Sequence, residues 1–159
     1  MRTFLRVGLA LALSLPLFAV VSPTPAHADA VTSMDDVLYQ RLNPGTGASL
    51  VTPWSDEAAA AASQYGYSTD LGTPFKASTT AVSGLTAVHR LWNATTIDFT
   101  EALDGSAAFT KAKAAGYSDQ GVRYYALASS ATGTQPVNTY VKSGKHRLAT
   151  AATGASLVS

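Results

Sequence analysis

The residues of this 159-residue chain best suited to contact a ligand are its aromatic side chains. A flat aromatic face with a polar rim can stack against a sugar ring at a low cost in conformational entropy. Packing is the alternative, because aromatic residues at alternating strand positions usually fill a core. The candidate ligand-binding residues are four aromatic residues and one polar turn residue: Tyr39, Trp54, Trp92, Asn93 and Tyr125.

The local context of these aromatic residues favours exposure for some of them. Tyr124 and Tyr125 are adjacent in an expected strand, so their side chains point to opposite faces and one of the two should be exposed. Trp92 lies beside an expected turn, and Trp54 lies just before an expected helix. Residues 93–95 also fit the acceptor pattern for N-glycosylation, but turn chemistry is the simpler explanation of an asparagine there.

Acid–base and metal chemistry have weaker support. His89 and His146 are 57 residues apart, and metal sites usually need three or more protein ligands, so we interpret both as structural or surface residues. Asp98 with Glu101 or Asp104 could form the carboxylate pair of a glycoside hydrolase, but no such pair recurs in the sequence repeat described below. We interpret these acids as a solvated turn before a helix, where acidic residues are favourable.

Composition excludes several other kinds of site. The chain has no cysteine, which excludes disulfides, thiolate zinc sites, iron–sulfur clusters and a cysteine nucleophile. It contains no G-x-S-x-G, G-x-G-x-x-G or phosphate-loop motif. Residues 29–159 carry nine Lys/Arg and ten Asp/Glu, a balance that argues against nucleic-acid binding and against a polybasic membrane surface. We therefore expect no cofactor and no metal.

The elements that must position the candidate residues recur at a spacing of about 50 residues. Residues 37–78 resemble residues 87–128, and a partial third copy covers residues 136–159. Matches at one spacing in different local contexts indicate tandem repeats. The matched landmarks are Asn43 with Asn93, residues 66–68 with 116–118, Gly72 with Gly121, and Phe75 with Tyr124.

Each full copy contains one expected helix. In the first copy Ser55 is the expected N-cap, and the run of alanines at residues 58–62 strongly favours a helix. In the second copy Ser106 or Asp104 is expected to cap a helix over residues 107–115. A glycine then follows each helix, at the position where a left-handed residue commonly ends one.

The pattern predicts a mainly β fold with one short helix per repeat. Each full copy has four short expected strands, of which the second is expected at residues 49–52 and 97–100. A unit of this size cannot bury its apolar side alone, so the units must share a core. We favour a β-trefoil-like arrangement, because closure leaves no exposed sheet edge, with the third repeat incomplete. An open array of small α+β units is the alternative.

Residues 1–28 predict a secretory signal peptide. A short positive segment is followed by an apolar stretch at residues 7–21 and an A-x-A pattern at residues 26–28. Fifteen helical residues span about 22 Å, less than the roughly 30 Å hydrocarbon core, so a membrane anchor is the weaker alternative. We expect cleavage after Ala28, or alternatively after Ala30. Residues 29–159 would then be a single secreted repeat domain with no stable membrane anchor.

These motifs resemble a family of secreted bacterial repeats of unknown function. The family pattern V-Y-R-L-Y-N is matched at residues 88–93 and more loosely at 38–43, and the closing pattern G-Y-x-x-E-G-x-x-F-Y is matched at residues 116–125. The middle pattern G-x-H-F-Y-T is poorly kept in all copies, at residues 47–52, 95–100 and 144–149. Only the third copy keeps its histidine, His146, which argues against a histidine-dependent role in the other two.

The resemblance covers about residues 36–159 and implies an accessory role. Members of the family often look like appendages of secreted hydrolases of cell walls and polysaccharides. No catalytic residues are established for the family, so the resemblance implies none here.

The leading expectation is a secreted, noncatalytic module that binds extracellular glycan or cell-wall material through aromatic and polar turn residues. The main alternative is a protein–protein interaction or inhibitor module that uses the same surface. A small secreted hydrolase is a third reading, and the lack of a repeated acid–base pair argues against it.

Overall fold

The computed structural model describes residues 25–151, 153 and 154, with side chains from residue 28 onward. The positive segment and apolar stretch of the expected signal peptide lie outside the described residues. In chain order the elements are α1 (Pro25–Ser33), β1 (Asp36–Leu42), β2 (Ser49–Thr52), α2 (Ser55–Gln64), β3 (Thr69–Asp70), β4 (Phe75–Ala77), β5 (Thr86–Asn93), β6 (Asp98–Leu103), α3 (Ala107–Ala114), β7 (Ser118–Ala126), β8 (Val137–Lys142) and β9 (Lys145–Thr150).

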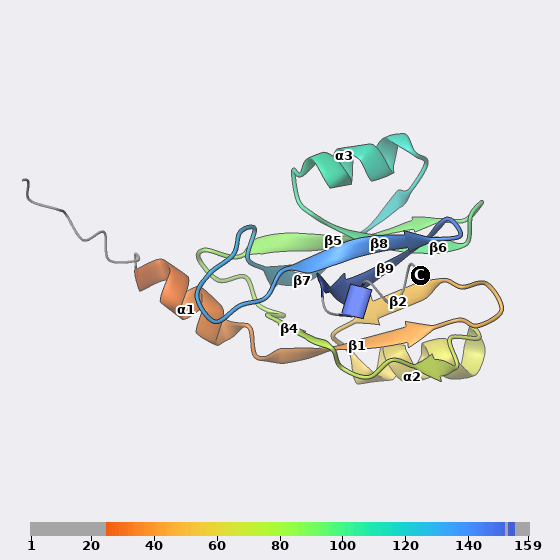
Figure 1. The fold of residues 1–159 in the computed structure, drawn as a ribbon, viewed down its shortest axis with the longest axis horizontal. Helices are drawn as coiled ribbons and strands as arrows, with labels where there is room; N and C mark the ends of the chain where they lie inside the picture. Colours follow the sequence, from red (N-terminus) through yellow and green to blue (C-terminus); the bar gives the residue numbers. More distant parts are fainter. Residues whose placement is uncertain (1–24, 152, 155–159) are drawn as a thin grey trace, which may run out of the picture.

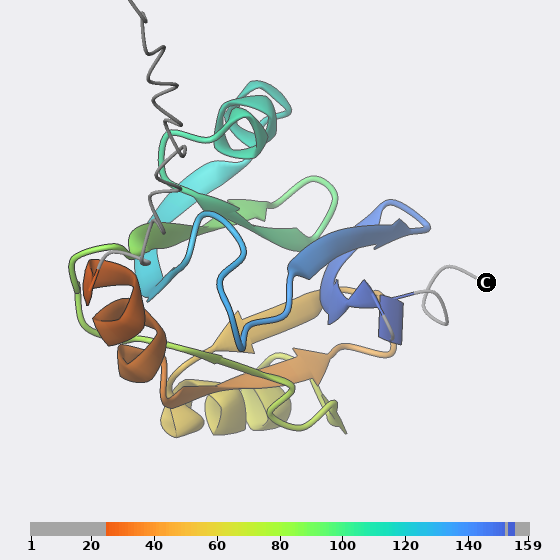
Figure 2. The same cartoon turned by 60° about the vertical axis from the view of Figure 1, so that its left-hand side comes forward.

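The fold is mainly β and consists of small antiparallel sheets (Figure 1). β1 pairs with β2, β3 and β4 in the first sheet, and β5 pairs with β6 and β7 in the second. β8 and β9 form a third hairpin and, within the described part of the chain, pair only with each other. The helices α2 and α3 lie on opposite outer sides of the molecule, with the three hairpins between them (Figures 1 and 2).

In each of the first two hairpins, one asparagine links the turn to the end of the helix that follows. The Asn43 side-chain oxygen accepts hydrogen bonds from two backbone N–H groups of its turn, at 2.9 and 3.1 Å, and its Nδ2 donates to Tyr65 O at 3.0 Å. Asn93 makes the same set of bonds, at 3.0 and 3.1 Å within its turn and 3.2 Å to Ala115 O. An asparagine in such a turn therefore fixes both the hairpin and the helix position.

The strand register corrects the alignment of the second hairpin. Asp98 pairs with Asn93, and Ile97 just before it has φ 50°, much as Gly47 before β2 has φ 75°. The middle element of the second copy therefore begins at Ile97, two residues later than the sequence comparison placed it. A β-branched residue in this left-handed region is strained. Because no glycine stands there, the sequence does not indicate that residue 97 is the left-handed position before the strand.

β6 is longer than the expected strand at residues 97–100. The antiparallel ladder to β5 continues through Glu101, opposite Arg90, to Leu103, opposite Val88. The interpretation of Asp98 and Glu101 as part of a solvated turn was therefore wrong. Pairing with β5 extends the strand so that both acids lie within it, where Asp98 is fully buried and Glu101 Oε1 is buried.

The two main helices begin differently from each other. Ser106 caps α3 as predicted, with its Oγ accepting a hydrogen bond from Phe109 N at 3.1 Å. Ser55 is instead the first residue of α2, and Trp54 is the N-cap residue, without a side-chain capping bond. The prediction that Ser55 caps this helix was wrong, because Trp54 occupies the N-cap position.

The core lies where the three hairpins meet. The second strands of the hairpins, β2, β6 and β9, contact one another. The central cluster contains Leu38, Val51, Phe75, Ala77, Val88, Tyr124 and Leu148. Smaller apolar clusters lie under α2 and α3. The described residues contain no helix long and apolar enough to cross a membrane.

Candidate functional site

The most exposed tryptophan lies where α2 meets the second sheet. Trp54 has 44% of its surface exposed, and its backbone N–H donates to Thr52 Oγ1 at 3.2 Å. The Arg123 guanidinium of β7 lies over its ring, 5.6 Å from the ring centre. A cation over an indole face is attracted by the ring quadrupole, so this contact fixes the orientation of both groups.

A network of charged side chains joins the same two elements. Arg90, only 4% exposed, donates from Nη2 to Glu57 Oε1 at 2.6 Å and from Nε to Gln120 Oε1 at 3.1 Å. The second oxygen of Glu57 accepts a hydrogen bond from the Thr52 hydroxyl. We call the group Trp54, Glu57, Arg90, Gln120 and Arg123 the Trp54 seam.

Charge and burial act against each other in the Trp54 seam. Burial raises the pKa of Glu57, but hydrogen bonds from Arg90 and Thr52 and the charges of Arg90 and Arg123 outweigh it, so the pKa lies below its ordinary value. Burial and the nearby charge of Arg90 lower the pKa of Arg123. Glu57 is therefore the anion that balances two neighbouring guanidinium groups.

Two nitrogens of the seam remain without a hydrogen-bond partner in the described part of the chain. They are Arg90 Nη1 and Arg123 Nε, both buried. A buried N–H without a partner is unfavourable, and it is usually satisfied by water or by a ligand oxygen. The seam therefore combines an exposed indole face with oriented donors and one carboxylate, a combination suited to a polar molecule with an apolar face.

The other residues predicted to bind a ligand lie outside this seam. Trp92 is half-buried, and its ring packs against that of Phe99 with centres 4.4 Å apart. Tyr39 and Tyr125 are half-buried and Tyr124 is buried, so neither of the two adjacent tyrosines is exposed in the way that their alternation predicted. Asn93 is buried and uses its amide group in the turn described above.

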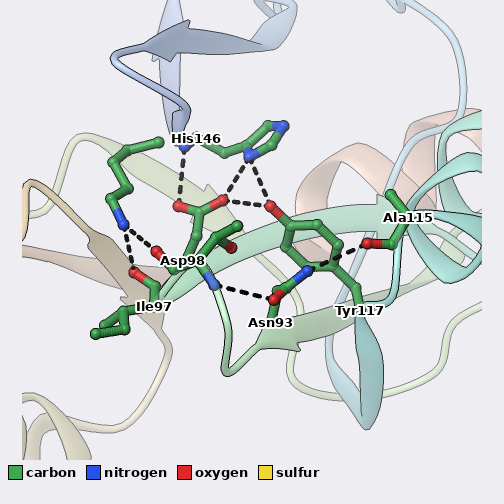
Figure 3. Close-up of polar contacts among 8 residues, drawn as sticks. Asn93, Ile97, Asp98, Ala115, Tyr117 and His146 are labelled. Carbon is green, nitrogen blue, oxygen red and sulfur yellow. Dashed lines mark hydrogen bonds and ion pairs between the residues drawn. The ribbon is translucent and has the colours of Figure 1, made fainter.

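A second polar cluster joins the third hairpin to the second sheet (Figure 3). The fully buried Asp98 accepts hydrogen bonds at Oδ2 from the Tyr117 hydroxyl, at 2.6 Å, and at Oδ1 from the backbone N–H of His146, at 3.0 Å. His146 Nδ1 lies 2.6 Å from the same Oδ2. Lys145 donates to the backbone oxygens of residues 96 and 97 beside it. These bonds attach β9 to the start of β6.

The Asp98 cluster has the geometry of a carboxylate that orients an imidazole. Burial, the hydrogen bond to Asp98 and its negative charge raise the pKa of Tyr117 to about 12, so the phenol stays protonated and donates. General-base catalysis also needs a substrate or nucleophile within reach of the second imidazole nitrogen. The hydrogen bonds between Asp98 and His146 connect the third hairpin to the second sheet.

His89 contacts a different set of carboxylates from His146. Its Nδ1 lies 3.0 Å from both oxygens of Asp119, its Nε2 lies 3.8 Å from Asp104, and its ring meets Phe109 edge-on. Burial raises the pKa of Asp119, but the hydrogen bonds from His89 and from the Gly121 N–H, together with the charges of His89 and Lys113, outweigh it, so the pKa lies below its ordinary value. Across the residues the structure covers, no group of three or more His, Asp or Glu side chains is arranged to hold a metal ion.

Comparison with known protein families identifies the family to which the chain belongs. The profile of a family described as a domain of unknown function (DUF5648) matches residues 37–156. The chain belongs to this family. No curated protein and no solved structure matches it. The DUF5648 match covers both the Trp54 seam and the Asp98 cluster, so both lie inside the family domain.

Sequence reasoning found one member of the Trp54 seam and missed the others. Glu57 lies at the start of an expected helix, and Arg90, Gln120 and Arg123 lie within the segments that match the family patterns, but none of the four was predicted to bind a ligand. Arg90 is directly followed by Leu91 and Trp92 in an expected strand of the DUF5648 domain, and a charge beside such apolar residues indicates a buried partner. The identity of that partner depends on tertiary structure, because Glu57 lies in the first turn of α2, which packs on the first sheet.

Proposed function

We propose that this DUF5648 protein is a secreted, noncatalytic module that binds extracellular glycan at the Trp54 seam. The observation that carries the proposal is an exposed indole face held in place by Arg123 beside buried donors that lack partners. A sugar ring stacks its C–H face on such an indole, and its hydroxyls exchange hydrogen bonds with guanidinium, amide and carboxylate groups.

Three further elements complete the proposal. The leader-like residues 1–28 support export, and the resemblance to accessory modules of polysaccharide hydrolases supports a role in targeting. The mutual contacts of β2, β6 and β9 support a β-trefoil-like relation among three repeats. The protein would then act outside the cell, with an extracellular glycan or cell-wall polymer as its partner.

The test is a pull-down of the purified protein on washed cell walls and on insoluble polysaccharides. We expect saturable retention that falls at least tenfold for Trp54→Ala, because losing a stacking platform removes about 1.4 kcal/mol or more of binding free energy. Tyr65→Ala is the matched control, since Tyr65 is 67% exposed at the other end of α2. Circular dichroism would first confirm that both variants are folded.

The outcomes separate the two main functions. Retention that is lost in Trp54→Ala and kept in Tyr65→Ala supports glycan binding at the seam. A folded protein that no polysaccharide retains contradicts the proposal and favours the protein-partner alternative. Equal losses in both variants would place binding on α2 as a whole and refute the role of the Trp54 seam.

A further inference from the structure

A groove of about 810 Å³ lies on the side of the molecule that carries α1. It runs between α1, β4, the second sheet and the segment that leads from β7 to β8. Figure 2 shows α1 and this segment, in blue, flanking the same side of the sheets. The groove shares no lining residue with the Trp54 seam, so the two are separate features.

The groove has the size and chemistry of a small-molecule site. Such sites typically have volumes of about 300–1,000 Å³ and apolar walls with a few oriented polar groups. Aliphatic and aromatic side chains predominate among its lining residues, including Met34, Leu38, Phe75, Val88 and Leu103. Lys76 at its rim is already paired with Asp35, at 2.5 Å.

One acidic side chain lines this apolar groove. Glu101 Oε1 is buried and has no hydrogen-bond partner in the described part of the chain. Burial raises the pKa of Glu101 to about 8, with Asp98 adding to the rise and Arg90, its cross-strand neighbour, opposing it. Tyr124 of β7 is the other titratable group nearby, and burial, with a smaller contribution from Glu101, holds its pKa well above the ordinary value. At neutral pH Glu101 is therefore an uncharged carboxyl group that can donate a hydrogen bond.

We propose that this groove binds a neutral, mainly apolar molecule whose oxygen, such as an ester or ketone carbonyl, accepts a hydrogen bond from Glu101. The walls favour the apolar body of the ligand, because its burial removes apolar surface from water on both sides. The carbonyl oxygen gives the neutral carboxyl the partner that the protein does not supply, which relieves the cost of a buried polar group without one.

Ligand charge distinguishes this proposal from its alternatives. A cationic amphiphile would require Glu101 to be ionised, and its binding would strengthen as the pH rises through 8. A carboxylate ligand would be repelled once Glu101 ionises, and charge makes it costly to bury in these walls at any pH. A neutral acceptor binds best while Glu101 is protonated, and its affinity falls as the carboxyl group loses its proton.

The test uses Nile red, a neutral carbonyl-bearing dye whose fluorescence rises in apolar surroundings, with the full protein. We expect saturable 1:1 binding that methyl laurate displaces. The apparent affinity should fall about tenfold between pH 6 and pH 9, because only about a tenth of Glu101 with a pKa of about 8 remains protonated at pH 9. Glu101→Gln, which keeps a neutral donor, should bind without this pH dependence. Glu101→Leu should bind at least tenfold more weakly than the wild-type protein at pH 6.

Two further variants keep the proposal falsifiable. Ala128→Trp, at an exposed position in the lining, should block the groove without disturbing the core, and Asp104→Asn is a matched carboxyl control outside it. Dye binding that Ala128→Trp leaves intact, or that strengthens above pH 8, overturns the proposal, as does the absence of binding by folded protein. Trp54→Ala should bind the dye normally, so failure here is distinct from failure of glycan binding.

Discussion

The buried carboxyl of Glu101 should make the stability of this protein depend on pH in an unusual direction. The pKa of Glu101 rises from 4.5 to about 8 on folding, chiefly because its carboxyl is buried. At about 1.36 kcal/mol per pKa unit, this rise limits the loss of free energy of unfolding on ionisation of Glu101 to about 5 kcal/mol. This is comparable to the whole free energy of unfolding of a small domain, which is about 5–15 kcal/mol.

The sign follows from which state holds the proton. Below pH 4.5 Glu101 is protonated in both the folded and unfolded states, so its ionisation does not change the free energy of unfolding. Between pH 4.5 and about 8 only the folded state keeps its proton, so the free energy of unfolding falls as the pH rises. Above pH 8 the carboxyl is ionised in both states, and the loss is complete. Glu57 and Asp119, whose pKa values are lowered, act in the opposite direction and only at lower pH.

The assay is urea denaturation, followed by tryptophan fluorescence, at intervals from pH 5 to pH 9. Glu101→Gln keeps the shape and hydrogen-bonding capacity of the protonated acid but cannot ionise. We expect the variant to lie within about 1 kcal/mol of the wild-type protein at pH 5 and to exceed its stability by several kcal/mol at pH 8. Asp104→Asn, at an exposed carboxyl of the same segment, should leave the wild-type pH dependence unchanged. A wild-type protein and Glu101→Gln variant with parallel pH profiles would refute the reasoning.

Two further predictions concern the second hairpin. Ile97→Gly should stabilise the protein by about 1 kcal/mol, because the left-handed conformation costs an L-residue about 1–2 kcal/mol and glycine's greater chain entropy offsets part of the gain. Urea denaturation measures this, and the prediction fails if Ile97→Val, which keeps the strain, is stabilised equally. Asp98→Asn should destabilise the protein by about 2–3 kcal/mol, because its carboxylate accepts bonds from Tyr117 and His146 that an amide replaces poorly. Faster amide exchange at His146 would locate the loss at the third hairpin, and an unchanged exchange rate would contradict it.

The local elements of the fold were largely predictable because their signals are local. Alanine runs, glycines after helices and asparagines in turns act within a few residues, and the structure places helices and hairpins at these signals. Errors arose at boundaries where long-range pairing decided the outcome. β6 extends past its expected end because β5 pairs with it, and Trp54 rather than Ser55 occupies the N-cap position of α2.

The candidate sites were less predictable, because each depends on side chains from distant segments. Trp54 could be named from its place before a helix, but Arg123, which orients it, lies 69 residues further along the chain. Glu101 carried no sequence signal of burial, since an acid directly after an expected strand usually faces water. Its neighbours in the groove come from α1, β4 and the segment after β7.

The sequence by itself determined the mainly β class, the short helices, the spacing of the hairpins and the absence of cysteine chemistry, because these depend on composition and on interactions between near neighbours. Tertiary structure alone decided which polar groups became buried and which side chains they contact. Arg90 contacts Glu57, Asp98 contacts His146, and Glu101 Oε1 has no hydrogen-bond partner within the described part of the chain, because the packing of three hairpins against one another fixes these outcomes.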